Sequence, residues 1–157
     1  MRNLSINLLP ETYFKKYFLQ IKEALDLVNY SELEKVAGLV RESQELGKKV
    51  IIVGNGGSAS IASHLTVDLI NAAKIKAVNF NESSIITCFA NDYGYENWVA
   101  KALDCYADSG DVVILISSSG QSENMLVGAK RAKSMNVDVV TLSGFSSDNS
   151  LRQLGDI

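Results

Sequence analysis

Two runs of aliphatic residues, each followed at once by a small polar loop, constrain the fold of this chain most strongly. Residues 49 to 53 read Lys-Val-Ile-Ile-Val and stop at Gly54, while residues 111 to 116 read Asp-Val-Val-Ile-Leu-Ile and stop at a run of serines. Short runs rich in β-branched residues, bounded by turn residues, are typical of strands buried on both faces of a parallel sheet. We therefore expect both segments to lie inside one sheet.

Helix-like and strand-like segments alternate along the rest of the chain after residue 48. We expect helices over residues 58–71, 95–107 and 123–135, and strands over residues 76–80 and 137–142. Residues 83 to 90 are compatible with either a strand or a helix. The alternation predicts an α/β sandwich with a mostly parallel sheet, whose ligands bind beyond the carboxyl ends of the strands.

Two amphipathic segments precede the first expected strand. Residues 11 to 29 carry apolar side chains at helical spacing, and Ser31 followed by Glu34 resembles a capping box that opens a second helix through about residue 46. We expect these segments to form an N-terminal helical hairpin that packs outside the α/β core or against a partner subunit. The apolar positions of the first segment are Phe14, Phe18, Ile21, Leu25 and Val28.

The composition narrows the classes of function. A chain of 157 residues is expected to form one domain, with the α/β core over about residues 48–157. The net charge of −3 argues against nucleic-acid binding, which needs a basic surface. No apolar run approaches the roughly 18 residues that span a bilayer, so no membrane partner is expected. The early Pro10 and Glu11 do not resemble a signal peptide.

The two cysteines favour a reducing compartment. Cys88 and Cys105 lack the paired spacing of a metal site, and nothing in the chain resembles a disulfide framework. We therefore expect two buried free thiols in a cytoplasmic protein.

The loops that follow the two apolar runs have the chemistry of a phosphate site. We name residues 54–58, Gly-Asn-Gly-Gly-Ser, the glycine loop, and residues 117–122, Ser-Ser-Ser-Gly-Gln-Ser, the serine loop. A helix N-terminus presents unpaired N–H groups to an anion, glycine allows close approach of the backbone, and serine adds hydroxyl donors. Either loop alone could merely cap its helix, but two such loops after two buried strands favour a shared phosphate site.

A dinucleotide site is an alternative for the glycine loop. Gly54, Gly56 and Ala59 satisfy the pattern G-x-G-x-x-A after an expected strand. The acidic residue that would bind the ribose is poorly placed, because Asp68 comes too early and Glu82 comes late. A nucleoside-triphosphate loop fits less well, since no G-K-[ST] follows the glycines.

Three motifs carry a resemblance to a known family. The segments G-N-G-G-S-A-S-I-A-S-H-L-T-V-D-L, F-A-N-D-Y-G-Y and I-S-S-S-G-Q-S-E-N-M-L resemble, in the same order, those of the sugar isomerase (SIS) domain family, and of its phosphoheptose isomerases in particular. The resemblance implies a flavodoxin-like three-layer sandwich that binds a sugar phosphate. It also implies a homotetramer with sites between subunits.

The resemblance assigns a set of substrate-binding residues. Asp92 matches an aspartate that contacts sugar hydroxyls, although the pattern Asn-Asp-x-Gly is by itself typical of a turn. The residues that match the sugar-phosphate pocket are Asn55, Gly56, Gly57 and Ser58 of the glycine loop, with Ser117, Ser118, Ser119 and Ser122 of the serine loop.

The reaction that the resemblance implies is an aldose–ketose isomerisation. Sedoheptulose 7-phosphate and D-glycero-D-manno-heptose 7-phosphate would interconvert through an enediol in heptose biosynthesis, which needs acid–base groups and no redox cofactor. His64 and Asp68 are four residues apart and share a helix face. Asp68 stands where the subfamily carries its glutamate base. His64 matches a histidine that can ligate a metal, so the resemblance implies a candidate zinc site at His64 and Asp68.

Two departures from the subfamily pattern leave a second function open. Aspartate is one methylene shorter than glutamate, and the subfamily's second catalytic histidine, on a final helix, has no counterpart because His64 is the only histidine. We expect the native chain to continue past Ile157, where the family's next strand should begin, and the 157-residue chain to have little activity. The alternative is a non-catalytic SIS module that binds a phosphosugar or a protein partner in regulation.

Overall fold

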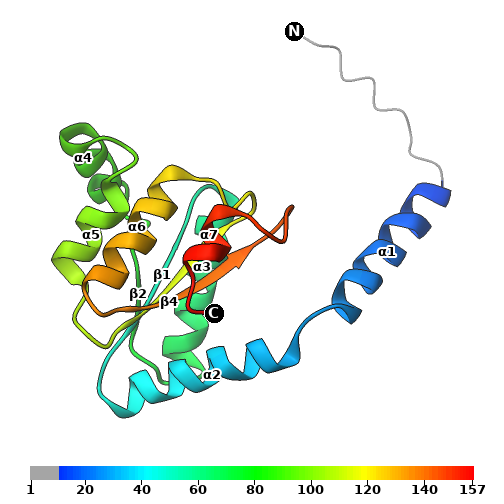
Figure 1. Cartoon of the computed structure of the whole chain (residues 1–157), viewed down its shortest axis with the longest axis horizontal. Coiled ribbons are helices and arrows are strands. Elements are labelled where there is room, and N and C mark those ends of the chain that lie inside the picture. Colours follow the sequence, from blue (N-terminus) through cyan, green and yellow to red (C-terminus); the bar gives the residue numbers. More distant parts are fainter. Residues whose placement is uncertain (1–10) are drawn as a thin grey trace, which may run out of the picture. The chain divides into compact units, whose positions relative to one another are not determined.

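The computed structural model describes residues 11–157, which form two units divided between Leu33 and Glu34, within α2 (Figure 1). In chain order the elements are α1 (Glu11–Asp26), α2 (Tyr30–Glu45), β1 (Val50–Gly54), α3 (Gly57–Asn71), β2 (Ala77–Asn79), α4 (Ser83–Tyr93), α5 (Trp98–Tyr106), β3 (Val112–Ser117), α6 (Glu123–Ser134), β4 (Asp138–Ser143) and α7 (Ser150–Leu154). No helix among these residues combines the length and the apolar character that crossing a bilayer requires.

Both N-terminal helices are present, but the second begins differently from our expectation. The side-chain Oδ1 of Asn29 accepts hydrogen bonds from the backbone N–H groups of Ser31 (3.0 Å) and Glu32 (3.4 Å). The capping box of Ser31 and Glu34 is therefore wrong, because Asn29 caps α2 and the helix already includes Ser31. Packing of α1 and α2 as a hairpin stays a prediction.

The four strands form one parallel sheet in the order β2-β1-β3-β4. This is the strand order of flavodoxin-like folds, in which the chain first builds outward from β1 to β2 and then crosses back to β3. The predicted α/β class with a parallel sheet is confirmed. Each strand lies within about one residue of its expected position, with β1 and β3 in the interior.

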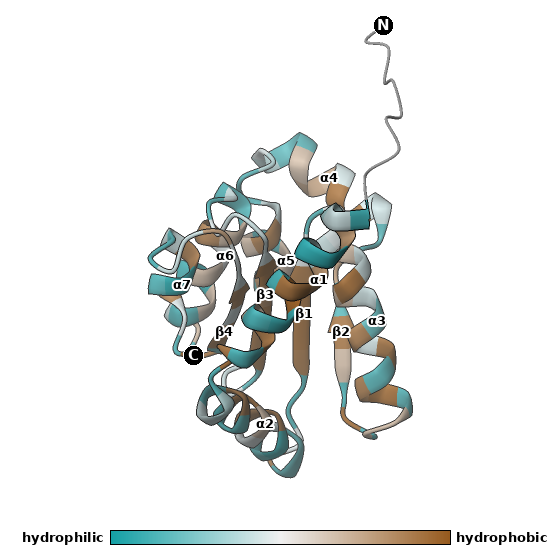
Figure 2. Cartoon of the chain, turned by 90° about the vertical axis from the view of Figure 1, so that its right-hand side faces the viewer, coloured by the Kyte–Doolittle hydropathy of each residue, from teal (hydrophilic) through white to brown (hydrophobic). Residues whose placement is uncertain are grey.

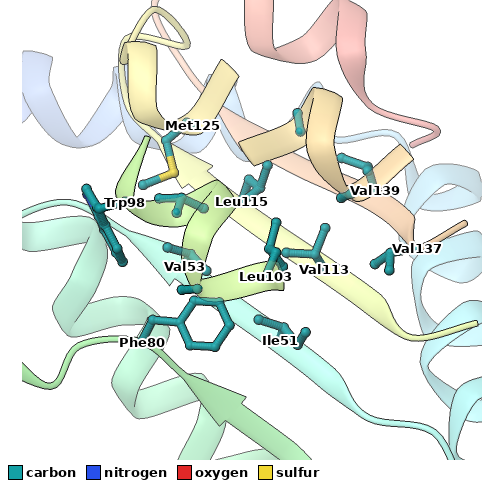
Figure 3. Close-up of a cluster of buried hydrophobic side chains, with 14 of the residues drawn as sticks. Ile51, Val53, Phe80, Trp98, Leu103, Val113, Leu115, Met125, Val137 and Val139 are labelled. Atoms are coloured by element: carbon teal, nitrogen blue, oxygen red, sulfur yellow. The ribbon is translucent and has the colours of Figure 1, made fainter. Parts of the chain in front are cut away.

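Helices cover both faces of the sheet. Alternate residues of β3 point to opposite faces, so Val113 and Leu115 pack in one buried cluster and Val112 and Ile114 in another. The first cluster, drawn in Figure 3, contains side chains of α5 and α6 such as Trp98 and Met125. The second contains side chains of α3 and of the part of α2 after Glu34. Burial on both faces explains why β1 and β3 are hydrophobic along their length (Figure 2).

The ambiguous segment after β2 is a helix. The carboxylate of Glu82 accepts a hydrogen bond from the backbone N–H of Ile85 at 3.0 Å and caps α4. Gly94, with a φ of +88°, ends the helix. The turn expected at Asn91–Gly94 is therefore the C-terminal end of α4.

The cysteines depart from the sequence-based expectation. Cys88 on α4 and Cys105 on α5 are free thiols as expected, but both are exposed, so the prediction that they are buried is wrong. Helices at the outside of a sandwich bury only one face, and both cysteines lie on the other.

An ion-pair cluster connects the first residues of β1 and β3. It lies at the amino-terminal ends of the strands, opposite the glycine and serine loops, which follow their carboxyl ends. The Nζ of Lys49 lies 2.7 Å from Asp108 Oδ2 and 2.6 Å from Asp111 Oδ2. Asp111 is fully buried and also accepts hydrogen bonds from the backbone N–H groups of Lys49 (3.0 Å) and Asp108 (2.8 Å).

This cluster gives stability a defined pH dependence. Partial burial alone would lower the pKa of Lys49, but hydrogen bonds with Asp108 and Asp111 and their charges raise it. The hydrogen bond from Lys49 lowers the pKa of the Asp108 carboxyl. A raised lysine pKa stabilises the fold below the unfolded value of 10.5 and loses that effect at higher pH. A lowered aspartate pKa stabilises the fold above the unfolded value of 3.8 and loses that effect on acidification.

We therefore expect the free energy of unfolding, measured by urea titration, to fall above pH 10.5 and below pH 3.8. Asp108→Asn should flatten the acid limb slightly, because the substituted side chain no longer titrates and the exposed Asp108 contributes little to stability. An acid limb unchanged in Asp108→Asn would contradict the assignment.

Candidate functional site

The glycine and serine loops lie at the point where the connections of the sheet change direction. β1 and β3 are neighbours in the sheet, yet α3 follows β1 on one face and α6 follows β3 on the other. Between two such strands the loops diverge and leave a crevice at the carboxyl ends, where α/β proteins of this type bind ligands. The sheet order therefore brings together two loops that are about 60 residues apart in the chain.

The glycine loop needs its glycines to pass from β1 into α3. A Cβ added to Gly54 would lie 2.5 Å from the backbone carbonyl of Ser58, so the first turn of α3 can approach the strand only at glycine. Gly56 has a φ of +54° and stands at the N-cap of α3, where it supplies no side-chain capping bond. At the start of α3 the backbone N–H groups of Ser58 and Ala59 donate to the carbonyls of Asn55 (2.9 Å) and Gly56 (3.0 Å). The N–H of Gly57 and the hydroxyl of Ser58 are therefore the donors that this helix start presents to an anion.

The serine loop gathers its hydroxyls at the N-terminus of α6. Ser117 Oγ and Ser122 Oγ lie 3.2 Å apart, and Ser119 Oγ accepts a hydrogen bond from the backbone N–H of Gln121 at 3.2 Å. Ser118 is exposed and Ser122 is the N-cap residue of α6, without a side-chain capping bond. The predicted serines therefore share one loop with a helix N-terminus, as a phosphate site requires.

A buried asparagine that the sequence reasoning missed supports the serine loop from the segment after β4. Asn149 Nδ2 donates to Ser143 Oγ at 2.9 Å and to the carbonyl of Ser146 at 2.8 Å, while its Oδ1 caps α7. Gly120, with a φ of +62°, packs so closely on Asn149 that any Cβ there would overlap the carboxamide. The only advance signal was Asn149 before a short helical pattern.

A pair of amides joins the glycine loop to α6. Asn55 Nδ2 donates to Asn124 Oδ1 at 3.0 Å, and Asn124 Nδ2 donates to Asn55 Oδ1 at 3.0 Å. The hydroxyl of Tyr95 donates to the same Oδ1 of Asn55 at 3.2 Å. Of these residues only Asn55 was predicted from the sequence. Asn124 is 2% exposed, and its amide is satisfied by this pair.

His64 and Asp68 lie together on α3, as their spacing predicted. His64 Nε2 is 3.4 Å from Asp68 Oδ2, and the two side chains are 82% and 59% exposed. This interaction is their only side-chain polar contact within residues 11–157. The structure thus pairs the two expected acid–base groups with one another, and it shows no contact between them and the serine loop.

Asp92 lies on the last turn of α4, away from a direct contact with either loop. Its carboxylate accepts hydrogen bonds from Cys88 Sγ at 3.6 Å and from Asn91 Nδ2 at 2.9 Å. Desolvation, with the charge of Asp92, raises the pKa of the Cys88 thiol. A role for Asp92 in binding sugar hydroxyls stays a prediction.

Neither a metal site nor a dinucleotide site gains support from the described residues. No three His, Cys, Asp or Glu side chains among residues 11–157 are grouped to hold a metal ion, and the two donors His64 and Asp68 are fewer than a zinc site uses. The carboxylate of Glu82, the later candidate for a ribose contact, is engaged in capping α4. Backbone hydrogen bonds from Ser84 and Ile85 lower the pKa of that carboxyl.

The fold and the two loops are those of a known class of phosphosugar-binding domains. The family model described as the SIS domain matches residues 13–144, and the chain belongs to this family. Relatives that it resembles include phosphoheptose isomerases. It is 36% identical over 132 residues to that of Cytophaga hutchinsonii, covering 81% of this chain and 69% of the relative. It is 37% identical over 143 residues to that of Helicobacter pylori, covering 85% and 74%.

Solved structures agree with the sequence comparison. A phosphoheptose isomerase from Francisella tularensis superposes with a TM-score of 0.82 at 26% identity, covering 92% of this chain and 78% of the other. The resemblance drawn from the three motifs is therefore confirmed.

Proposed function

We propose that this chain is a phosphosugar isomerase that interconverts sedoheptulose 7-phosphate and D-glycero-D-manno-heptose 7-phosphate. One observation carries the proposal: the glycine and serine loops meet at the carboxyl ends of β1 and β3 in a chain 36% to 37% identical to phosphoheptose isomerases. The N-termini of α3 and α6, with the hydroxyls of Ser58, Ser119 and Ser122, bind the phosphate. Anchoring the phosphate holds the reacting carbons at a constant distance from the acid–base groups.

Isomerisation from the ketose requires a proton to leave C1 and a proton to arrive at C2, while the hydroxyl proton moves from O1 to O2. In our proposal the Asp68 carboxylate takes the C1 proton and returns it to C2 of the enediol. His64, 3.4 Å away, holds the Asp68 carboxylate and exchanges protons with the sugar oxygens.

The exposure of this pair supports a homo-oligomeric enzyme. Proton transfer from carbon is favoured in a site that excludes water, and the two side chains are 82% and 59% exposed. A second copy of the chain would enclose them, so we propose a homotetramer with sites between subunits. The exposed free thiols Cys88 and Cys105 agree with a cytoplasmic enzyme.

The direct test is an isomerase assay in deuterated water. With sedoheptulose 7-phosphate as substrate, we expect the aldose to form with deuterium at C2, because a proton that passes through an enediol exchanges with solvent. Binding of the sugar phosphate without turnover would instead support the non-catalytic SIS module. Binding of a dinucleotide in place of the sugar phosphate would contradict both.

We expect Ser119→Ala to weaken binding of sedoheptulose 7-phosphate by about 10- to 100-fold, because the substitution removes one hydroxyl donor to a charged phosphate. Isothermal titration calorimetry measures this change. Ser134→Ala, at the opposite end of α6, is the matched control and should bind as tightly as the wild type. An unchanged dissociation constant for Ser119→Ala would remove Ser119 from the phosphate site.

A further inference from the structure

The amide pair between Asn55 and Asn124 fixes which way the Asn55 side chain faces. Each amide both donates and accepts at 3.0 Å, so neither can rotate without breaking two hydrogen bonds. Asn124 is 2% exposed and lies among the core residues of α6, which restrains it further. Hydrogen bonding to the buried Asn124 therefore holds the side chain of Asn55, a partly exposed loop residue, in one orientation.

Tyr95 completes the set of partners of the Asn55 oxygen. Its hydroxyl donates to Asn55 Oδ1 at 3.2 Å, so this oxygen accepts from both Tyr95 and Asn124. An amide oxygen has two lone pairs and an amide nitrogen two N–H groups. Only one N–H of Asn55 stays without a partner among the described residues, so the side chain is presented as a donor.

This network borders an open cavity with acidic walls. The cavity of about 360 Å³ is lined by Asn55, Tyr95, Glu96, Ser122, Glu123 and Asn124. Its lining contains two carboxylates and no lysine, arginine or histidine, and Ser122 is the residue that it shares with the proposed phosphate site. Beside these carboxylates an uncharged group is favoured over a phosphate dianion. Carboxylates accept hydrogen bonds from hydroxyl groups, and an amide N–H donates to a hydroxyl oxygen. The lining therefore suits an uncharged polyol.

Gly94, at the end of α4, leaves room for the carboxylate of Glu96. A Cβ on Gly94 would lie 2.5 Å from Glu96 Oε1, and the φ of +88° at Gly94 is one that glycine adopts readily. Any other residue at this position would displace the Glu96 side chain.

We propose that this cavity is the subsite for the uncharged polyol part of the sugar phosphate. The free N–H of Asn55 donates to a sugar hydroxyl oxygen, and the carboxylates of Glu96 and Glu123 accept from sugar hydroxyl groups. Asn124 and Tyr95 are positioning residues, which act through Asn55. The identity of the sugar rests on the proposed function, whereas the fixed donor orientation of Asn55 rests on the hydrogen bonds alone.

The test is a double-mutant cycle of Tyr95→Phe and Asn55→Ala, read by calorimetry with two probes. With sedoheptulose 7-phosphate, Tyr95→Phe is expected to raise the dissociation constant by about 3- to 10-fold in the wild-type background. In the Asn55→Ala background it should cause no further change. With inorganic phosphate, Tyr95→Phe should leave the dissociation constant unchanged. Tyr106→Phe, on a residue of similar exposure on α5, is the control.

Additive effects of the two substitutions, or equal weakening of both probes, would overturn the proposal, since Tyr95 would then act elsewhere or only support the loop. A ligand-free measurement separates this failure from failure of the proposed function. In ¹⁵N NMR spectra, Tyr95→Phe and Asn124→Leu should shift the side-chain amide signals of Asn55. Unshifted signals overturn the network whether or not a sugar binds. Shifted signals in a chain that binds no sugar phosphate support the fixed orientation of Asn55 but overturn both the polyol subsite and the isomerase.

Discussion

An Asp68→Asn variant is expected to lose about 100- to 10,000-fold in kcat, the range typical of removing a general base. The amide is almost the same size as the carboxylate but cannot accept a proton from C1. Because the Asp68 side chain is 59% exposed and makes its one polar contact within residues 11–157 with His64, the substitution should leave the fold intact. Steady-state kinetics with sedoheptulose 7-phosphate, beside a thermal unfolding curve, measures both effects.

The matched control is Asp68→Glu, which supplies the longer carboxylate that the family resemblance implies at this position. We expect this variant to keep or increase the wild-type kcat, since it retains a carboxylate that can accept a proton and lengthens its reach by one methylene. Full activity in Asp68→Asn would show that another group removes the proton. Equal loss in both variants would show that Asp68 supports the structure rather than the chemistry.

An Asp111→Ala variant is expected to lower the free energy of unfolding by about 3–5 kcal/mol, the range for breaking a buried ion pair by removing one partner. The Asp111 side chain is 1% exposed and accepts from Lys49 Nζ and from two backbone N–H groups. Its removal takes the acceptor from the two backbone N–H groups and leaves Lys49 Nζ with only the exposed carboxylate of Asp108. Urea unfolding followed by circular dichroism measures the change.

The control for this substitution is Asp108→Ala. Asp108 binds the same lysine, but its side chain is 74% exposed, so water replaces the lost contact and stability should change little. Equal destabilisation by the two variants would contradict the dominant role of the buried carboxylate.

The strands β1 and β3 could be predicted from the sequence because both of their faces are buried. Such strands are continuously apolar and show no alternation of polar and apolar residues. Val50 to Val53 and Val112 to Ile116 are almost fully buried, and only continuous aliphatic runs satisfy such positions. Residues 83 to 90 could not be assigned because a short apolar run is compatible with either element. The carboxylate of Glu82 caps the start of this helix, and Gly94, with its positive φ, ends it.

Some residues of the candidate site could also be predicted from the sequence, and others could not. The glycines and serines of the two loops could be chosen from the sequence, because each loop stands beside a recognisable strand and their chemistry is local. Asn124 and Tyr95 could not be chosen, because their common partner Asn55 is 69 and 40 residues away in the chain. No local pattern reports a hydrogen bond across that separation.

The amino-acid sequence by itself determined the α/β class, the two phosphate-type loops and the family, since these depend on residue type and short-range spacing. Only the tertiary structure decided that the loops meet, because their meeting depends on β1 pairing with β3 rather than on either segment alone. It also decided that Asn55 is held as a donor beside an acidic cavity, while His64 and Asp68 lie exposed on α3. Burial and long-range hydrogen bonds arise only when distant segments pack together, so these features could not be predicted from the sequence.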